Sequence, residues 1–192
     1  MASATEPTAT ETGRRARVSP RALGLLALVA LVAYGLDQGT KYLITTNLEI
    51  DETVPVLGDV LQLHYVTNAG AAFSLATGFT WVLSLVAIGV IVIIAIFAPR
   101  IRSLGWATMF GLVLGGAFGN VTDRLFRPPG FGTGEVVDFV QVIYFPAIFN
   151  LADVAVVSAM GLFLLLSLRN VGLDGSRGPA RDEKHDEKPA AG

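Results

Sequence analysis

The sequence predicts an all-α polytopic membrane protein with four transmembrane helices, a small extracytoplasmic β-cradle and a loop or helix over the site between them. Three observations lead to this fold class. Charged residues make up only 16% of the 192 residues, whereas a soluble domain has about 25%. The long central stretch 22–168 holds fewer than half of these charges. Four apolar segments reach the roughly 20 residues that a membrane-spanning helix needs. This composition excludes a disordered protein, a nucleic-acid-binding protein and an ordinary soluble enzyme.

The four apolar segments are expected at 22–44, 79–98, 103–122 and 147–168. The second and third carry no charge, whereas the first contains Asp37 and Lys41 and the fourth contains Asp153. Arginines precede the first segment, as they do in a secretory signal peptide. Its apolar run is longer than the roughly 7–15 residues of a signal-peptide core and leads directly into Asp-Gln-Gly-Thr-Lys, so we expect a retained helix.

The distribution of arginines predicts the orientation in the membrane. They occur before the first segment, between the second and third, and after the fourth (Arg14, Arg15, Arg17, Arg21, Arg100, Arg102 and Arg169). Residues 45–78 contain no Lys or Arg, and 124–146 contain only Arg124 and Arg127. Because cytoplasmic loops are enriched in Lys and Arg, we expect both termini in the cytoplasm and these two segments outside.

The outer segments carry signs of structure of their own. Residues 60–66 alternate apolar and polar side chains, which is typical of a strand. Trp81, Tyr144 and Phe145 fall near helix ends on the same side, where aromatic residues meet the membrane surface. The terminal segments 1–21 and 169–192 are expected to be disordered cytoplasmic tails around a 22–168 membrane domain.

Glycines recur at every fourth position of the third segment, at Gly111, Gly115 and Gly119. This spacing places them on one face of a helix, where the missing side chains let another helix approach closely. We therefore expect a tightly packed helix pair.

Unusual polar residues gather at the predicted outer ends of the helices. Asn120 and Asp123 share the three-residue spacing of Asn150 and Asp153, which places an amide and a carboxyl group on one helix face. Arg124 lies next to the first pair. Ionisable residues in membrane helices are costly and usually functional.

Three aspartates could supply acid–base chemistry, namely Asp123, Asp138 and Asp153. Two half-buried carboxyl groups held close together share a proton, so that one can act as a general base on water and the other as a general acid. Spacing alone allows any two of them. Asp123 has Arg124 beside it and fits an ion pair or helix cap at least as well, whereas Asp138 and Asp153 have no cationic neighbour in the sequence.

Other interpretations stay open for several residues. Asp37 and Lys41 are four residues apart and suit a simple ion pair, and Asn68 suits a turn before Gly70. The chain has no cysteine and no zinc-protease, hydrolase or nucleotide-binding motif, so we expect neither metal nor cofactor. A small transporter with an ion site and a non-catalytic scaffold are the alternatives. The gathering of polar groups at one face disfavours the transporter, whose site would lie near the midplane.

Five motifs, in order along the chain, resemble those of the lipoprotein signal peptidase (signal peptidase II) family. They are Asp37-Gln-x-Thr-Lys41, Asn68-x-Gly70-x-Ala72-Phe73-Ser74, Gly119-Asn120-x-x-Asp123-Arg124, Val137-Asp138-Phe139 and Phe149-Asn150-x-Ala152-Asp153. The resemblance covers about residues 22–168. It implies a monomeric aspartic endopeptidase of the bacterial inner membrane, inhibited by globomycin. Such an enzyme cleaves diacylglyceryl-modified prolipoproteins in the membrane lipid, just before the lipidated cysteine.

The resemblance also implies roles for individual residues. Asp138 and Asp153 match the catalytic pair. Seven further positions match substrate-binding or supporting residues (Asn68, Asn120, Arg124, Asn150, Asp37, Lys41 and Asp123). The loop 128–134, rich in Pro and Gly, lengthens the connection before Asp138.

Overall fold

A computed structural model describes residues 18–70 and 80–176 of the chain. The predicted disorder of 1–17 and 177–192 concerns residues outside these ranges. The same is true of Ala72, Phe73 and Ser74 in the second motif.

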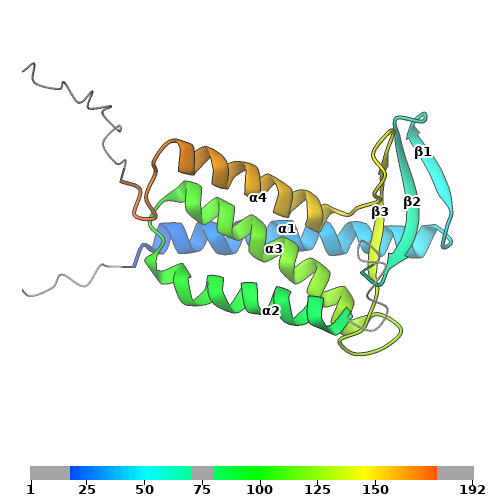
Figure 1. The fold of residues 1–192 in the computed structure, drawn as a ribbon, viewed down its shortest axis with the longest axis horizontal. Helices are drawn as coiled ribbons and strands as arrows, with labels where there is room; N and C mark the ends of the chain where they lie inside the picture. Colours follow the sequence, from blue (N-terminus) through cyan, green and yellow to red (C-terminus); the bar gives the residue numbers. More distant parts are fainter. Residues whose placement is uncertain (1–17, 71–79, 177–192) are drawn as a thin grey trace, which may run out of the picture.

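Four long helices form the body of the molecule (Figure 1). They are α1 (Pro20–Asn47), α2 (Thr80–Phe97), α3 (Leu104–Phe126) and α4 (Leu151–Leu168), with a short 3-10 helix, η2 (Ala98–Arg100), after α2. All four are long and apolar enough to cross a membrane. Helix α3 packs against each of the other three. The predicted fold class is confirmed.

The glycine face of α3 lies directly against α1, as its spacing predicts. A Cβ atom added at Gly115 would lie 2.6 Å from Cβ of Ala33 and 2.7 Å from the carbonyl oxygen of Ala30. The next glycine in the repeat, Gly119, faces the carboxylate of Asp37. The missing side chains therefore bring the polar ends of α1 and α3 into contact.

A three-stranded antiparallel sheet lies across one end of the bundle (Figure 1). Its order is β1 (Thr53–Leu57), β2 (Leu61–Asn68) and β3 (Val136–Val142). Strand β2 agrees with the predicted alternation. Strand β3, in a segment expected to be a loop, was not predicted, because its pairing partner β2 lies about 70 residues earlier in the chain and no local turn signals the contact.

Helix α1 extends two or three residues beyond both ends of the predicted 22–44 segment, and two further boundaries that differ from the prediction lie at the site. Helix α4 begins at Leu151 and not at 147, because Asn150 caps it: Oδ1 of Asn150 accepts from the backbone N–H of Asp153 at 3.1 Å. Asp153 thus lies in the first turn of α4. Helix α3 continues to Phe126, so Asp123 and Arg124 belong to its last turns.

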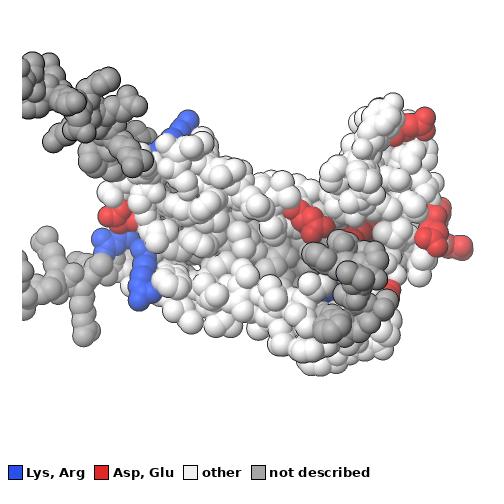
Figure 2. All heavy atoms as spheres, viewed as in Figure 1, with Lys and Arg blue, Asp and Glu red and all other residues white. Residues whose placement is uncertain are grey.

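The residues after α4 pack against the start of α3. The carbonyl oxygen of Leu173 accepts from the backbone N–H groups of Arg102 (2.9 Å) and Ser103 (3.0 Å), and the indole N–H of Trp106 donates to Val171. The packed membrane domain therefore extends past the expected boundary at 168. Lys and Arg side chains gather at this end, and acidic ones at the sheet end (Figure 2).

Candidate active site

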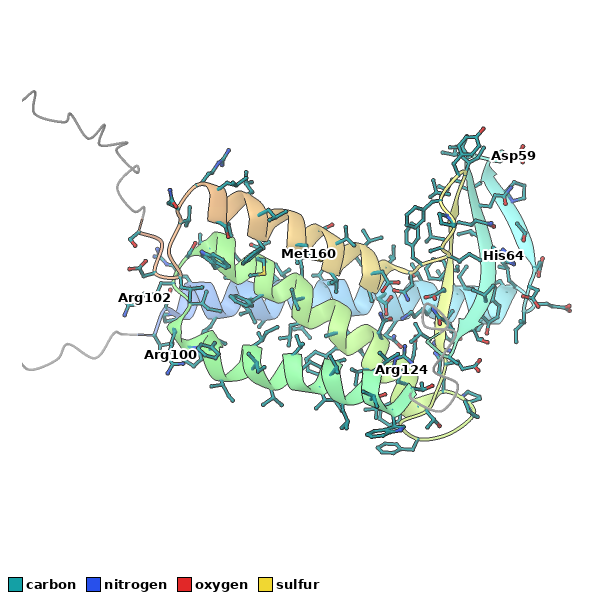
Figure 3. The ribbon with its side chains drawn as sticks, in the orientation of Figure 1. Asp59, His64, Arg100, Arg102, Arg124 and Met160 are labelled. Atoms are coloured by element: carbon teal, nitrogen blue, oxygen red, sulfur yellow. The ribbon has the colours of Figure 1, made fainter. Side chains whose placement is uncertain are left out.

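The sequence-predicted site residues come together at the sheet end of the bundle, where α1, α3, α4, β2 and β3 meet. Figure 3 shows polar side chains gathered there, with Arg124 labelled. Asp37, Lys41 and Asn150 are fully buried, and Asp123 and Asp138 are nearly so. The contacts divide them into two adjoining groups.

The first group, the ion-pair cluster, consists of Asp37, Lys41, Asp123 and Arg127. The ammonium of Lys41 lies 2.9 Å from Oδ2 of Asp37 and 2.8 Å from Oδ2 of Asp123. Nε of Arg127 lies 2.6 Å from the other oxygen of Asp123. Each carboxylate of this cluster therefore has a cation beside it, and the predicted pairing of Asp37 with Lys41 is confirmed.

The second group, the amide–aspartate cluster, consists of Asn68, Asn120, Asp138, Asn150 and Asp153. Asp138 projects from β3 and accepts two side-chain amides: Nδ2 of Asn68 donates to Oδ2 at 2.8 Å, and Nδ2 of Asn150 donates to Oδ1 at 2.6 Å. Asn68 also accepts from the backbone N–H of Gly70 at 2.8 Å. Asn68 therefore forms the predicted turn and also contacts a carboxyl group.

Asp153 accepts N–H groups in the same manner. Nδ2 of Asn120 donates to Oδ1 of Asp153 at 3.1 Å, and the backbone N–H of Asn150 donates to Oδ2 at 3.2 Å. All four carboxyl oxygens of Asp138 and Asp153 therefore accept an N–H. Among the described residues, neither carboxyl forms an ion pair within salt-bridge distance.

Asn150 links the two carboxyl groups. Its side-chain amide donates to Asp138, its backbone N–H donates to Asp153, and its Oδ1 accepts from the backbone of Asp153. Asn150, the N-cap of α4, thus holds the carboxyl group of Asp138 on β3 beside the first turn of α4.

Lys41 connects the two clusters through Asn120. Its ammonium donates to Oδ1 of Asn120 at 3.0 Å, and Nδ2 of Asn150 donates to the same oxygen at 3.2 Å. An ammonium can only donate, so this contact fixes which end of the Asn120 amide is the oxygen. The N–H end is thereby directed to Asp153.

Burial raises the pKa of Asp138 to about 6. The hydrogen bonds from Asn68 and Asn150 oppose this shift, and the nearby charge of Asp153 adds to it. A carboxyl group with such a pKa exchanges a proton near neutral pH, as an acid–base catalyst must.

A cavity of about 400 Å³ leads to this cluster between α2, α3 and α4. Its walls are alanine, valine and glycine residues, and Asn120 and Asp153 lie at its polar part. Near the cluster, Nη1 of Arg124 is buried and has no hydrogen-bond partner among the described residues. The carboxylates of Asp138, Asp123 and Asp153 are its electrostatic neighbours. The cavity can receive an apolar chain, and the polar residues at its end can bind a polar group on that chain.

Two members of the site were not singled out by sequence reasoning. Arg127 pairs with Asp123, and the side-chain amide of Gln38 donates to Asp37 and to the carbonyl oxygen of Gly119, both at 3.1 Å. The four-residue spacing of Asp123 and Arg127 was the available signal. Within residues 18–70 and 80–176, no group of three acidic or histidine side chains could hold a metal ion.

Comparisons with known proteins agree with the motifs. A sequence profile of the family described as signal peptidase (SPase) II matches residues 29–169. The chain is 54% identical over 186 residues to the lipoprotein signal peptidase of Leifsonia xyli subsp. xyli, covering 91% of this chain and 86% of that protein. It is 46% identical over 156 residues to that of Streptomyces coelicolor, covering 81% and 76%.

Solved structures show the same architecture. A bacterial membrane enzyme matches with a TM-score of 0.71 and 28% identity, over 80% of this chain and 97% of that one. A second matches with a TM-score of 0.70 and 25% identity, over 85% and 98%. With its four apolar helices, the chain is a multi-pass bacterial membrane protein, and by profile and relatives it belongs to the signal peptidase II family.

Proposed function

We propose that the chain is an aspartic endopeptidase of the bacterial cytoplasmic membrane that removes the signal peptide from diacylglyceryl-modified prolipoproteins, and that Asp138 and Asp153 are its catalytic pair. One observation carries the assignment of the pair. These two carboxyl groups are joined through Asn150 and have no salt-bridge partner among the described residues, whereas Asp123 is bound by two cations.

The proposed reaction needs one ionised and one protonated carboxyl group. The ionised aspartate takes a proton from a water molecule, whose oxygen attacks the carbonyl carbon before the lipidated cysteine. The protonated aspartate donates a hydrogen bond to the carbonyl oxygen as it gains negative charge. When the C–N bond breaks, the departing amine takes up a proton from the pair. Both carboxyl groups are held by N–H donors in the same manner, so we assign the two roles to the pair and not to its members.

Surrounding residues support the reaction in distinct ways. Nη1 of Arg124 is buried, has no hydrogen-bond partner among residues 18–70 and 80–176, and suits a carbonyl group of the substrate. Asn68, Asn120 and Asn150 hold the carboxyl oxygens and, like every side-chain amide, can both donate and accept. The extended substrate backbone needs such partners because hydrocarbon offers none. Asp37, Lys41 and Asp123 hold α1 to α3 beneath them.

The cavity between α2, α3 and α4 suits a substrate that arrives within the bilayer. We infer that the signal peptide and lipid chains approach through the membrane, both termini of the enzyme lie in the cytoplasm, and the sheet end faces outward. The enzyme acts as a monomer, and globomycin blocks the cavity.

The test is cleavage of a diacylglyceryl-modified prolipoprotein by the purified full chain in detergent. We expect the wild type to cut before the lipidated cysteine. Asp138→Asn and Asp153→Asn should each lower the rate at least about 10²–10⁴-fold, the usual contribution of a general acid or base. Both variants should keep the helix content of the wild type.

Asp59→Asn is the matched control, since Asp59 is an exposed carboxyl of the same sheet end. Its rate should equal that of the wild type. A wild type that does not cleave, or an Asp138 or Asp153 variant with full rate, would overturn the assignment.

A further inference from the structure

We propose that the far end of the sheet is a second membrane contact, which rests in the headgroup region of the leaflet nearest to it. This sheet tip consists of the β1–β2 turn, Leu57–Val60, and the residues after β3, Ile143–Phe145. The backbone N–H of Ile143 donates to the carbonyl oxygen of Val60 at 3.0 Å. The two segments therefore form one continuous surface, although they are distant in the sequence.

The sheet tip exposes large apolar and aromatic side chains. Tyr144 is 97% exposed, Leu57 65%, Val60 55% and Phe145 53%. An exposed apolar group of this kind marks an interaction surface. Tyrosine is enriched where a membrane meets water, because its ring is apolar and its hydroxyl is polar.

Backbone contacts place the sheet at the level where the membrane helices begin. Phe149 pairs with Val140 of β3 through two hydrogen bonds, of 2.8 and 3.1 Å. The residue after Phe149 is Asn150, the N-cap of α4. Helix α4 has 18 residues and so spans about 27 Å at 1.5 Å per residue, close to the hydrocarbon thickness of about 30 Å. Its first turn, and the strand tied to it, must lie at the membrane surface.

An aromatic pair continues from this level toward the tip. The rings of Phe145 and Phe149 meet edge to face with centroids 5.7 Å apart. Figure 1 shows the sheet crossing the helix axes and projecting beyond α4. The projecting part therefore overhangs the leaflet beside the bundle.

Charge is segregated across this overhang. In Figure 2 the projecting part of the sheet shows no charged side chain toward the notch beside α4; acidic side chains lie at the base of that notch and on the side of the sheet that faces away from the bundle. The exposed acids of this end are Glu49, Asp51, Glu52 and Asp59. Residues 45–78 contain no Lys or Arg, so attraction to anionic lipid cannot hold the tip. The contact we propose is apolar and aromatic, with the acids directed to water.

The backbone at Tyr144 adds an independent observation. Its φ is 62°, in the left-handed region that glycine and asparagine adopt more easily than a bulky residue. Glycine or asparagine would adopt this backbone conformation more easily than tyrosine. A tyrosine at this position is explained by a use for its ring outside the protein.

The absence of cysteine makes a direct test practical. Tyr144→Cys, labelled with an environment-sensitive fluorophore, is placed in nanodiscs of phosphatidylcholine that hold one copy of the full chain. Lipids with a spin label near the headgroup serve as quenchers. The matched control is Asp51→Cys, an exposed residue of the same end with a similar φ of 68°.

We expect the label at Tyr144 to emit at shorter wavelength and to be quenched by the spin-labelled lipid, and the label at Asp51 to behave as in water. Val60→Cys, on the other segment of the tip, is a second reporter and should behave like Tyr144. Equal, unquenched emission from all three sites in variants with wild-type helix content would overturn the proposal. So would quenching that appears only with two copies per disc, since a second chain would then be the partner.

Discussion

The ion-pair cluster and the amide–aspartate cluster lie side by side in the same buried end of the molecule, yet their carboxyl groups have different partners. Asp37 and Asp123 meet the charges of Lys41 and Arg127. In the part of the chain that the structure describes, Asp138 and Asp153 accept hydrogen bonds from amide N–H groups and pair with no cation. A neighbouring cation favours the ionised form of a carboxyl group, whereas burial favours the protonated form, which is the direction found for Asp138. The comparison separates aspartates that hold the helices together from aspartates available for chemistry.

The largest expected effect on stability comes from the ion-pair cluster. Asp123→Asn leaves Lys41 and Arg127 without their shared partner, so it should lower the free energy of unfolding by about 3–5 kcal/mol, as removal of one member of a buried pair does. Thermal melting in detergent measures it. Asp153→Asn is the matched variant, and it should melt near the wild type. Equal melting of the two variants would remove the distinction between the clusters.

The second prediction concerns pH. The pKa of Asp138 is raised to about 6 in the folded chain, from an ordinary 3.8. The folded state therefore binds the proton more tightly, and its stability falls as pH rises from about 4 to about 6. The loss amounts to about 3 kcal/mol, at 1.36 kcal/mol per pKa unit.

Melting temperatures of the wild type and Asp138→Asn, compared across this pH range, measure the effect. The difference in melting temperature should change between pH 4 and 6, by the equivalent of about 3 kcal/mol in the free energy of unfolding. Above about pH 7 it should stay constant. A difference independent of pH would show that Asp138 has an ordinary pKa.

The third prediction tests the connection between the clusters. Asn120→Ala removes the N–H donor to Asp153 and one partner of Lys41. A hydrogen bond to a charged group contributes about 1.5–3 kcal/mol, so kcat should fall roughly 10–100-fold. A smaller change in KM is expected, because the amide acts through Asp153. Asn47→Ala, in an exposed asparagine at the end of α1, is the control; an unchanged kcat for Asn120→Ala would mean that Lys41 does not act through this amide.

The smallest effect is expected at the solvent-facing edge of the ion-pair cluster. The side chain of Arg127 is 27% exposed, so water can replace much of its contact with Asp123. Arg127→Gln should cost only about 0–1 kcal/mol, as for surface ion pairs, and leave the cleavage rate unchanged. A loss as large as that of Asp123→Asn would show that both cations are needed equally.

Local patterns predicted much of this molecule correctly. The four spans follow from apolar length, the packing of α3 on α1 follows from the spacing of Gly111, Gly115 and Gly119, and strand β2 follows from alternation. The pairing of Asp37 with Lys41 is visible as a four-residue spacing, because one helical turn brings these positions together. Strand β3 and the start of α4 at Leu151 were missed, since each depends on a partner or cap whose effect local hydropathy does not report.

By itself the sequence determined that the chain crosses a membrane four times and that its polar residues concentrate at one end. Burying a charge in hydrocarbon is costly, so each charged residue within an apolar segment can be recognised from the sequence. On spacing alone it allowed any two of Asp123, Asp138 and Asp153, and the lack of a cationic neighbour in the sequence favoured Asp138 and Asp153. Only the tertiary structure shows which of the three carboxyl groups contacts a cation. Pairing of β3 with β2 carries Asp138 to the cap of α4, and packing of α3 on α1 gives Asp123 to Lys41. Both contacts join positions far apart in the chain, and no local spacing in the sequence encodes them.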